Sequence, residues 1–210
     1  MTIIYPLSLP DGKMTRVTLR VRRAQGVAES PFTLSQQVQS WTGARWELEA
    51  ELPIKSRADA DAWIAFKGQL RGRVGTFLAG DPGATSPRGT WAGTPVAHVA
   101  GSPTVGLSAA IILPVRGFTN GATVKAGDYF QLGSGLTSRM YRNLTDQTAG
   151  ASGQLNLDIE PPLNIDATDG QTLTTSSCKS LFRLADSVNE WSVEEALLYG
   201  VLPLAAVEAI

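Results

Sequence analysis

Two segments near the amino end of the chain alternate strictly between apolar and polar residues, and this alternation limits the possible folds more than any other feature. In residues 16–22 the apolar positions are Val17, Leu19 and Val21. In residues 45–52 they are Trp46, Leu48, Ala50 and Leu52, with Glu47, Glu49 and Glu51 between them. Successive side chains of a strand point to opposite faces, so this period predicts half-buried β-strands. We therefore expect a mainly β fold.

The second of these segments is expected to form a short hairpin with the residues before it. Residues 32–41 have the composition of an extended segment, and Thr42-Gly43-Ala44 has the residues of a turn. The predicted hairpin covers residues 32–52, with one apolar face and one acidic face.

One helix is predicted after this hairpin. Ser56 suits its N-cap, and Gly72 suits its end. The residues at helical spacing between them are Ala60, Trp63, Ile64, Phe66, Lys67 and Leu70. A strand over residues 74–79 is expected to follow.

A change of composition then predicts a crossing into a second domain. Residues 80–94, GDPGATSPRGTWAGT, have too few apolar positions for a core. Trp91 within them is expected to pack on the surface of the adjacent domain. Beyond the crossing, turns such as Lys125–Asp128 separate short strands, a spacing typical of a small barrel or sandwich. The strands are expected at residues 105–115, 129–132, 139–144, 154–160, 182–185, 190–193 and 204–210, while residues 194–199 suit a helical turn or a strand equally.

Charge is balanced over the whole chain but not along it. With 18 Lys and Arg against 19 Asp and Glu, the chain lacks the basic excess of a nucleic-acid-binding protein. Residues 1–93 hold 12 basic and 8 acidic residues, residues 94–183 hold 6 and 6, and residues 184–210 hold 0 and 5. This pattern favours a carboxy-terminal segment that packs on the amino-terminal part of the same or a neighbouring subunit.

The cysteine count and the hydropathy pattern indicate where the chain folds. Cys178 is the only cysteine, so no intrachain disulfide can form, and a reducing compartment is favoured. The first residues lack the pattern of a signal peptide, and no apolar run reaches the length of a membrane-spanning helix. We expect folding in a cytoplasm and no contact with a membrane.

His98, the sole histidine, is the first candidate for a catalytic residue, because histidine titrates near neutral pH. No motif accompanies it, so an ordinary strand histidine is expected. Cys178 has no base near it in sequence and is predicted to be a small buried or half-buried residue. Asp158 and Glu160 lie two apart on one strand and point to the same side, which is one ingredient of a glycosidase pair, but the solvated face of an alternating strand explains them better.

Two further segments resemble binding loops only loosely. Asp166, Asp169 and Gly170 lack the ligand pattern of a calcium loop, and Gly133-Ser134-Gly135 lacks the lysine of a phosphate loop. Both are predicted to be turns. We therefore predict no catalytic, cofactor-binding or metal-binding residues, and no enzymatic activity.

The five tryptophans leave a second class of function open, because aromatic faces stack on sugars. Trp46 and Trp63 are assigned to the core by their spacing. Trp41, Trp91 and Trp191 remain candidates for a carbohydrate-binding surface, to which Tyr129 is added. Carbohydrate binding is therefore the alternative function.

The order of these parts resembles the distal tail proteins, and related minor tail proteins, of long-tailed bacteriophages with non-contractile tails. In the amino-terminal part the resemblance lies in Ser30–Ser35, Ala44–Glu49, Ala60–Ala65 and Arg73–Leu78, which leads into Gly80–Pro82. In the second part it lies in Lys125–Leu132, Met140–Arg142, Leu155–Pro162 and Leu181–Leu184, which are similar to a barrel module of these proteins.

This resemblance implies a tail-tube-like β-sandwich with one flanking α-helix, formed by residues 1–93 plus 184–210. A small β-barrel, galectin-like or OB-like, is inserted as residues 94–183. The resemblance further implies a homo-hexameric ring that joins the tail tube protein to the tail-tip hub protein, with the tape measure protein as a further candidate neighbour. It also implies a central channel in the ring, through which the genome would pass without specific binding. Such a protein belongs to the virion and assembles in the host cytoplasm, and in the alternative function its inserted barrel binds host-surface glycans.

Overall fold

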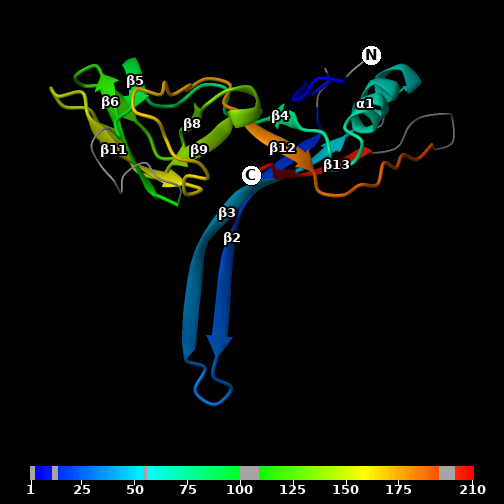
Figure 1. Cartoon of the computed structure of the whole chain (residues 1–210), viewed down its shortest axis with the longest axis horizontal. Coiled ribbons are helices and arrows are strands. Elements are labelled where there is room, and N and C mark those ends of the chain that lie inside the picture. The colour runs from blue at the N-terminus through cyan, green and yellow to red at the C-terminus, as the bar shows by residue number, and fades with distance from the viewer. Residues whose placement is uncertain (1–2, 11–13, 54–55, 100–108, 194–201) are drawn as a thin grey trace.

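The computed structural model describes residues 3–10, 14–53, 56–99, 109–193 and 202–210, and its fold is mainly β with one α-helix (Figure 1). Most of the elements form two neighbouring parts, and one long hairpin projects away from them. The helix α1 spans Arg57–Gln69. The strands are β1 Leu7–Ser8, β2 Arg16–Glu29, β3 Gln36–Leu52, β4 Phe77–Ala79, β5 Gly93–Ala97, β6 Ile112–Phe118, β7 Thr123–Val124, β8 Tyr129–Leu132, β9 Arg139–Asn143, β10 Gln147–Thr148, β11 Leu155–Glu160, β12 Ser180–Leu184 and β13 Leu202–Glu208.

The first part is a six-stranded sheet in the order β1-β4-β12-β13-β3-β2. It combines strands from both ends of the chain, and all pairings except the parallel β1–β4 pair are antiparallel. The predicted alternation is confirmed, because the apolar residues of β3 from Trp46 to Leu52 are buried. They form a hydrophobic core with Trp63, Phe66 and Leu70 from α1 and the residue after it.

The predicted hairpin over residues 32–52 is wrong. β2 and β3 pair with each other along most of their length, and the chain reverses at Ser30–Ser35. Thr42-Gly43-Ala44 lies inside β3. Arg23 pairs with Ala44 and Gln25 pairs with Ser40, so the turn-like residues are absorbed by an irregularity in the pairing, a bulge opposite Ala24.

The helix prediction is confirmed, and the strand after it is shorter than predicted. Gly72 has a φ of +67°, a left-handed conformation that suits glycine at the end of a helix. The amide of Gly75 donates to the carbonyl of Leu70 at 2.8 Å, so the chain is still turning there. β4 consequently covers Phe77–Ala79 instead of residues 74–79.

The second part contains a five-stranded sheet in the order β5-β6-β11-β9-β8 and the small β10–β7 pair. It has its own hydrophobic core. Trp91 lies in that core and is 5% exposed, so the prediction that it packs on a domain surface is wrong. Of the strand predicted over residues 105–115, positions 105–108 lie outside the described residues, and β6 begins at Ile112.

Toward the carboxy end, β12 and β13 confirm two predicted strands and return the chain to the first sheet. The strand predicted over residues 190–193 does not form, and Trp191 is exposed. Residues 194–199 lie outside the described residues. The division into residues 1–93 plus 184–210 and residues 94–183 stays a prediction. None of the described helical residues makes a segment long and apolar enough to span a membrane.

Candidate functional site: the hairpin arm

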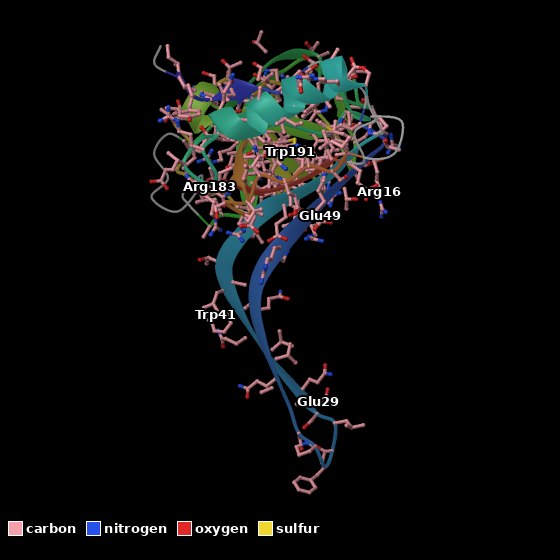
Figure 2. All side chains as sticks on the ribbon, turned by 90° about the vertical axis from the view of Figure 1, so that its right-hand side faces the viewer. Arg16, Glu29, Trp41, Glu49, Arg183 and Trp191 are labelled. Carbon is pink, nitrogen blue, oxygen red and sulfur yellow. The ribbon has the colours of Figure 1, made fainter. Side chains whose placement is uncertain are left out.

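The most unusual surface of the molecule is the outer part of the β2–β3 hairpin, residues 24–43, which we call the arm. Figure 1 shows it extending away from both sheets, and Figure 2 shows Trp41 on the part nearer the sheets and Glu29 near its end. β13 pairs with β3 over Glu47–Leu52, and no described strand pairs with the arm. Among the described residues, no hydrogen bond or ion pair joins residues 25–42 to the chain outside the arm. An isolated two-stranded hairpin is marginally stable in water, so the arm needs support from elsewhere.

The chemistry of the arm is that of an interaction surface. Glu29 is its only charged residue. Its large apolar side chains are all more than half exposed, and they are Val27, Phe32, Leu34, Val38 and Trp41. Clustered exposed apolar side chains mark sites that contact another molecule.

Hydrogen bonds within the turn at Ser30–Ser35, which we call the tip, give it a defined shape. The amide of Ser30 donates to the carbonyl of Ser35, and the amide of Leu34 donates to the carbonyl of Ser30, both at 2.9 Å. The hydroxyl oxygen of Ser30 accepts the amides of Phe32 and Thr33 at 3.4 Å. The turn leaves Phe32 93% exposed.

The two faces of the arm differ. Val27 pairs with Val38 on one face. On the other face Trp41 lies over Gly26, where an added Cβ would lie 3.1 Å from the indole. The absence of a side chain at Gly26 therefore makes room for Trp41, whose indole remains 58% exposed.

Where the arm meets the first sheet, its uncharged residues give way to arginines. Arg22, Arg23 and Arg45 line a cavity of about 370 Å³ together with Ala24, Gly43, Ala44 and Ile210, and we call this cavity the root groove. Glu47 beside it accepts from Arg20 Nε at 3.0 Å and lies 3.5 Å from a guanidinium nitrogen of Arg22 and one of Arg45. Burial acts to raise the pKa of Glu47, but the bond from Arg20 and the neighbouring positive charges outweigh it and lower the pKa.

Of the carboxylates Asp158 and Glu160, Glu160 forms ion pairs that connect the two parts of the fold. It accepts from Arg23 at 2.9 Å and from Arg142 at 2.5 Å, so it joins the root of the arm to the second sheet. Burial acts to raise its pKa, but these arginines lower it. A glycosidase acid needs a raised pKa. The alternation predicted for this strand is confirmed, because Leu157 and Ile159 are buried, whereas Asp158 and Glu160 are half-buried and so only partly in solvent.

The remaining candidates for chemistry contact other protein groups. His98 Nδ1 lies 3.0 Å from a guanidinium nitrogen of Arg116 and 3.7 Å from Asp169. Asp169 accepts hydrogen bonds from the amide of Val99 and from a guanidinium nitrogen of Arg116. These bonds stabilise the predicted turn, and Asp169 is not the first ligand of a calcium loop. Cys178 is buried as predicted, and burial raises the pKa of its thiol to about 11.

The structure also shows where the remaining candidate residues lie. Gly133 and Gly135 both have positive φ, which confirms the predicted turn. The described part of the chain contains no cluster of His, Cys, Asp and Glu that suits a metal ion. Trp46 and Trp63 are buried as predicted, whereas Trp91 donates to Asp128 at 2.8 Å inside the second core. Trp41 and Trp191 therefore remain the exposed tryptophans.

Sequence reasoning missed the arm. One signal was present: residues 24–43 carry a single charge, whereas the segments on either side alternate between apolar and charged residues. Ser30-Pro31 was also available as a turn. No protein-family model and no curated protein sequence matches the chain.

Proposed function

We propose that the protein is a ring-forming structural component of a bacteriophage tail tip, a distal tail protein that joins the tail tube to the tail-tip hub. The observation that carries this proposal is the arm, with apolar side chains on both faces and both edges unpaired among the described strands. Such a ribbon gains stability only when another molecule covers it. In a homo-oligomer, identical copies supply that cover.

The proposed architecture is a tail-tube-like sandwich with a flanking helix and an inserted barrel. It is supported by the origin of the strands, because the first sheet uses β1–β4, β12 and β13, whereas the second uses β5, β6, β8, β9 and β11 between them. In this proposal the first sheet and the arm form the ring of identical copies. The tail tube protein, the hub protein and the tape measure protein are the proposed neighbours, and the protein acts by geometry without catalysis.

Electron microscopy of the full chain tests this proposal. We expect six-fold rings of the purified protein, or density for such a ring at the end of added tail tubes that lack their tips. A chain that stays monomeric and never joins the tubes, even beside its partners, would contradict the proposal.

Carbohydrate binding is the second candidate, supported by the exposed indoles of Trp41 and Trp191. It is weakened within the second part, because Trp91 is buried there and Tyr129 is half-buried against Trp46. A glycan array with the full chain and with the Trp41→Ala, Trp191→Ala double variant distinguishes the two. Binding that disappears in the variant would support this candidate.

A further inference from the structure

We propose that the tip of the arm docks into the root groove of a second copy of the chain. This inference rests on the proposed function, because it names the contact between the copies. The tip contributes Phe32 and Leu34, and the groove contributes the side chains and the backbone between Arg22–Ala24 and Gly43–Arg45.

A tip that fills the groove must come from another copy, because the tip and the groove lie at opposite ends of one ribbon. Between them the strands pair without a shift from Gln25–Ser40 to Glu29–Gln36. At about 3.3 Å per residue, these positions alone separate the two ends by roughly 13 Å. The tip therefore cannot reach the groove of its own arm.

The shape of the groove suits an aromatic side chain. Ala24, Gly43 and Ala44 are small, so they leave a hollow of about 370 Å³ beside Ile210. This volume lies at the lower end of the range of ligand-binding pockets. The arginines beside it can place guanidinium groups and aliphatic stems against the ring of Phe32, an arrangement that favours cation–π contact.

Charge also matches the two surfaces. The ion pairs around the groove involve Arg20, Arg22, Arg23, Arg45 and Arg142 on one side and Glu47, Glu49 and Glu160 on the other, which leaves two positive charges in excess. Arg22 is the most exposed of these arginines at 71%. Glu29 carries the single negative charge of the arm next to its tip. An incoming arm therefore brings a carboxylate to a surface with excess positive charge.

The tip is already ordered for docking. Its backbone is held by the bonds of Ser30, and Leu34 has a φ of +55°, a left-handed conformation that is rare for a leucine. Strained backbone of this kind clusters at binding sites, and a pre-ordered loop loses less entropy when it binds.

The geometry of this contact determines the kind of assembly. Each copy offers one tip and one groove, and the two surfaces differ, so the contact is head-to-tail. Repetition of such a contact closes a ring or extends an open chain.

Two full-length variants test the contact by complementation. Phe32→Ser removes the ring of the tip. Gly43→Phe is designed to fill the groove, and its Cβ would lie 3.5 Å from the Cβ of Ala24, an ordinary van der Waals contact. We expect sedimentation velocity to show that each variant alone is monomeric, whereas an equal mixture forms dimers through the one remaining tip and the one remaining groove.

The control is Leu136→Ser, which removes an exposed apolar side chain from the second part. We expect it to assemble like the wild type. If both test variants also assemble like the wild type, or if their mixture stays monomeric, the docking contact is refuted while the proposed function stands. If the wild type never assembles, even on tail tubes, both proposals fail.

A charge exchange provides a second test that leaves the shape of the tip and groove largely intact. Glu29→Arg and Arg22→Glu should each weaken association about tenfold or more, because each places like charges together. A chain that carries both substitutions should recover most of the lost association. Equal losses in the single and double variants would refute the pairing of these two residues.

Discussion

The two halves of the β2–β3 hairpin are made by the same pair of strands and differ in almost every physical respect. In the inner half, which we call the base, Leu19 and Leu48 pair on the side packed against the core, and Arg20 and Glu47 pair on the opposite face. In the arm, Val27 and Val38 pair in solvent. Strand pairing alone therefore does not stabilise a hairpin. Its stability comes from the residues that pack against its faces.

If the proposed assembly holds, this difference separates residues that stabilise the fold from residues that join the copies. A fully buried large apolar side chain in the base contributes about 1.5–3 kcal/mol to folding. Phe32 and the valines of the arm contribute little until a second molecule covers them. Substitutions in the base should therefore change the free energy of unfolding, and substitutions in the arm should change association.

The largest expected effect comes from two tryptophans of β3 that lie five residues apart. Trp46 is 1% exposed and donates to the carbonyl of Met140 at 2.8 Å. Trp46→Ala should lower the free energy of unfolding by about 3–5 kcal/mol, because it leaves a cavity. Trp41→Ala, the matched control in the arm, should change it by less than about 1 kcal/mol. Urea unfolding of dilute protein measures both, and equal losses would break the comparison.

The next effect concerns the carboxylates of the base and the arm. Glu47→Gln should lower the free energy of unfolding by about 1–2 kcal/mol near pH 7, because Glu47 accepts a charged hydrogen bond from Arg20. Glu29→Gln should leave it unchanged. The pKa of Glu47 is lowered from 4.5 by folding. The difference between wild type and Glu47→Gln should therefore be complete well above pH 4.5 and disappear as the pH falls through the lowered pKa. A difference that persists unchanged in acid would contradict this role.

Glu208 is expected to have a smaller effect on the free energy of unfolding, with the opposite dependence on pH. Its carboxyl accepts the amide of Trp46 at 3.0 Å, and burial raises its pKa above 4.5. The folded protein should therefore lose part of its stability as the pH rises from about 4.5 through the raised pKa. Glu208→Gln, which keeps a neutral acceptor, should remove that loss, by about 1 kcal/mol. The test is to measure the free energy of unfolding of the wild type and of Glu208→Gln across this pH range. Identical pH profiles for the two proteins would contradict this role of Glu208.

The smallest effect on stability should come from the Val27→Thr, Val38→Thr double variant. Both side chains are exposed, so the free energy of unfolding of the monomer should change by less than about 0.5 kcal/mol. Association, measured by sedimentation, should nevertheless weaken. A large loss of stability would show that the arm is supported by its own chain.

The parts of the fold that the sequence predicts correctly are those in which a buried face demands apolar residues at a fixed period. The alternation around Leu48 and the helical spacing around Trp63 are of this kind. The hairpin turn was misplaced because Thr42-Gly43-Ala44 has turn residues, and a bulge uses the same residues. The burial of Trp91 depends on Asp128, a partner that is distant in sequence.

The arm was not predicted for a related reason. Neither of its faces packs on its own chain, so its residues carry no apolar alternation from which a strand can be recognised. Alternation reports the burial of one strand face against the rest of the chain, and residues 25–42 have no such buried face. The near absence of charge was the signal that remained.

The most direct test of the account removes the arm and leaves the base. Arg23 pairs with Ala44, so an Asn-Gly turn in place of residues 24–43 should connect the two strands. Native mass spectrometry of this variant and the wild type, alone and on tail tubes, measures assembly, and urea unfolding measures stability. The account predicts a variant of nearly unchanged stability that no longer associates, beside a wild type that does. A variant without the arm that assembles like the wild type would contradict it.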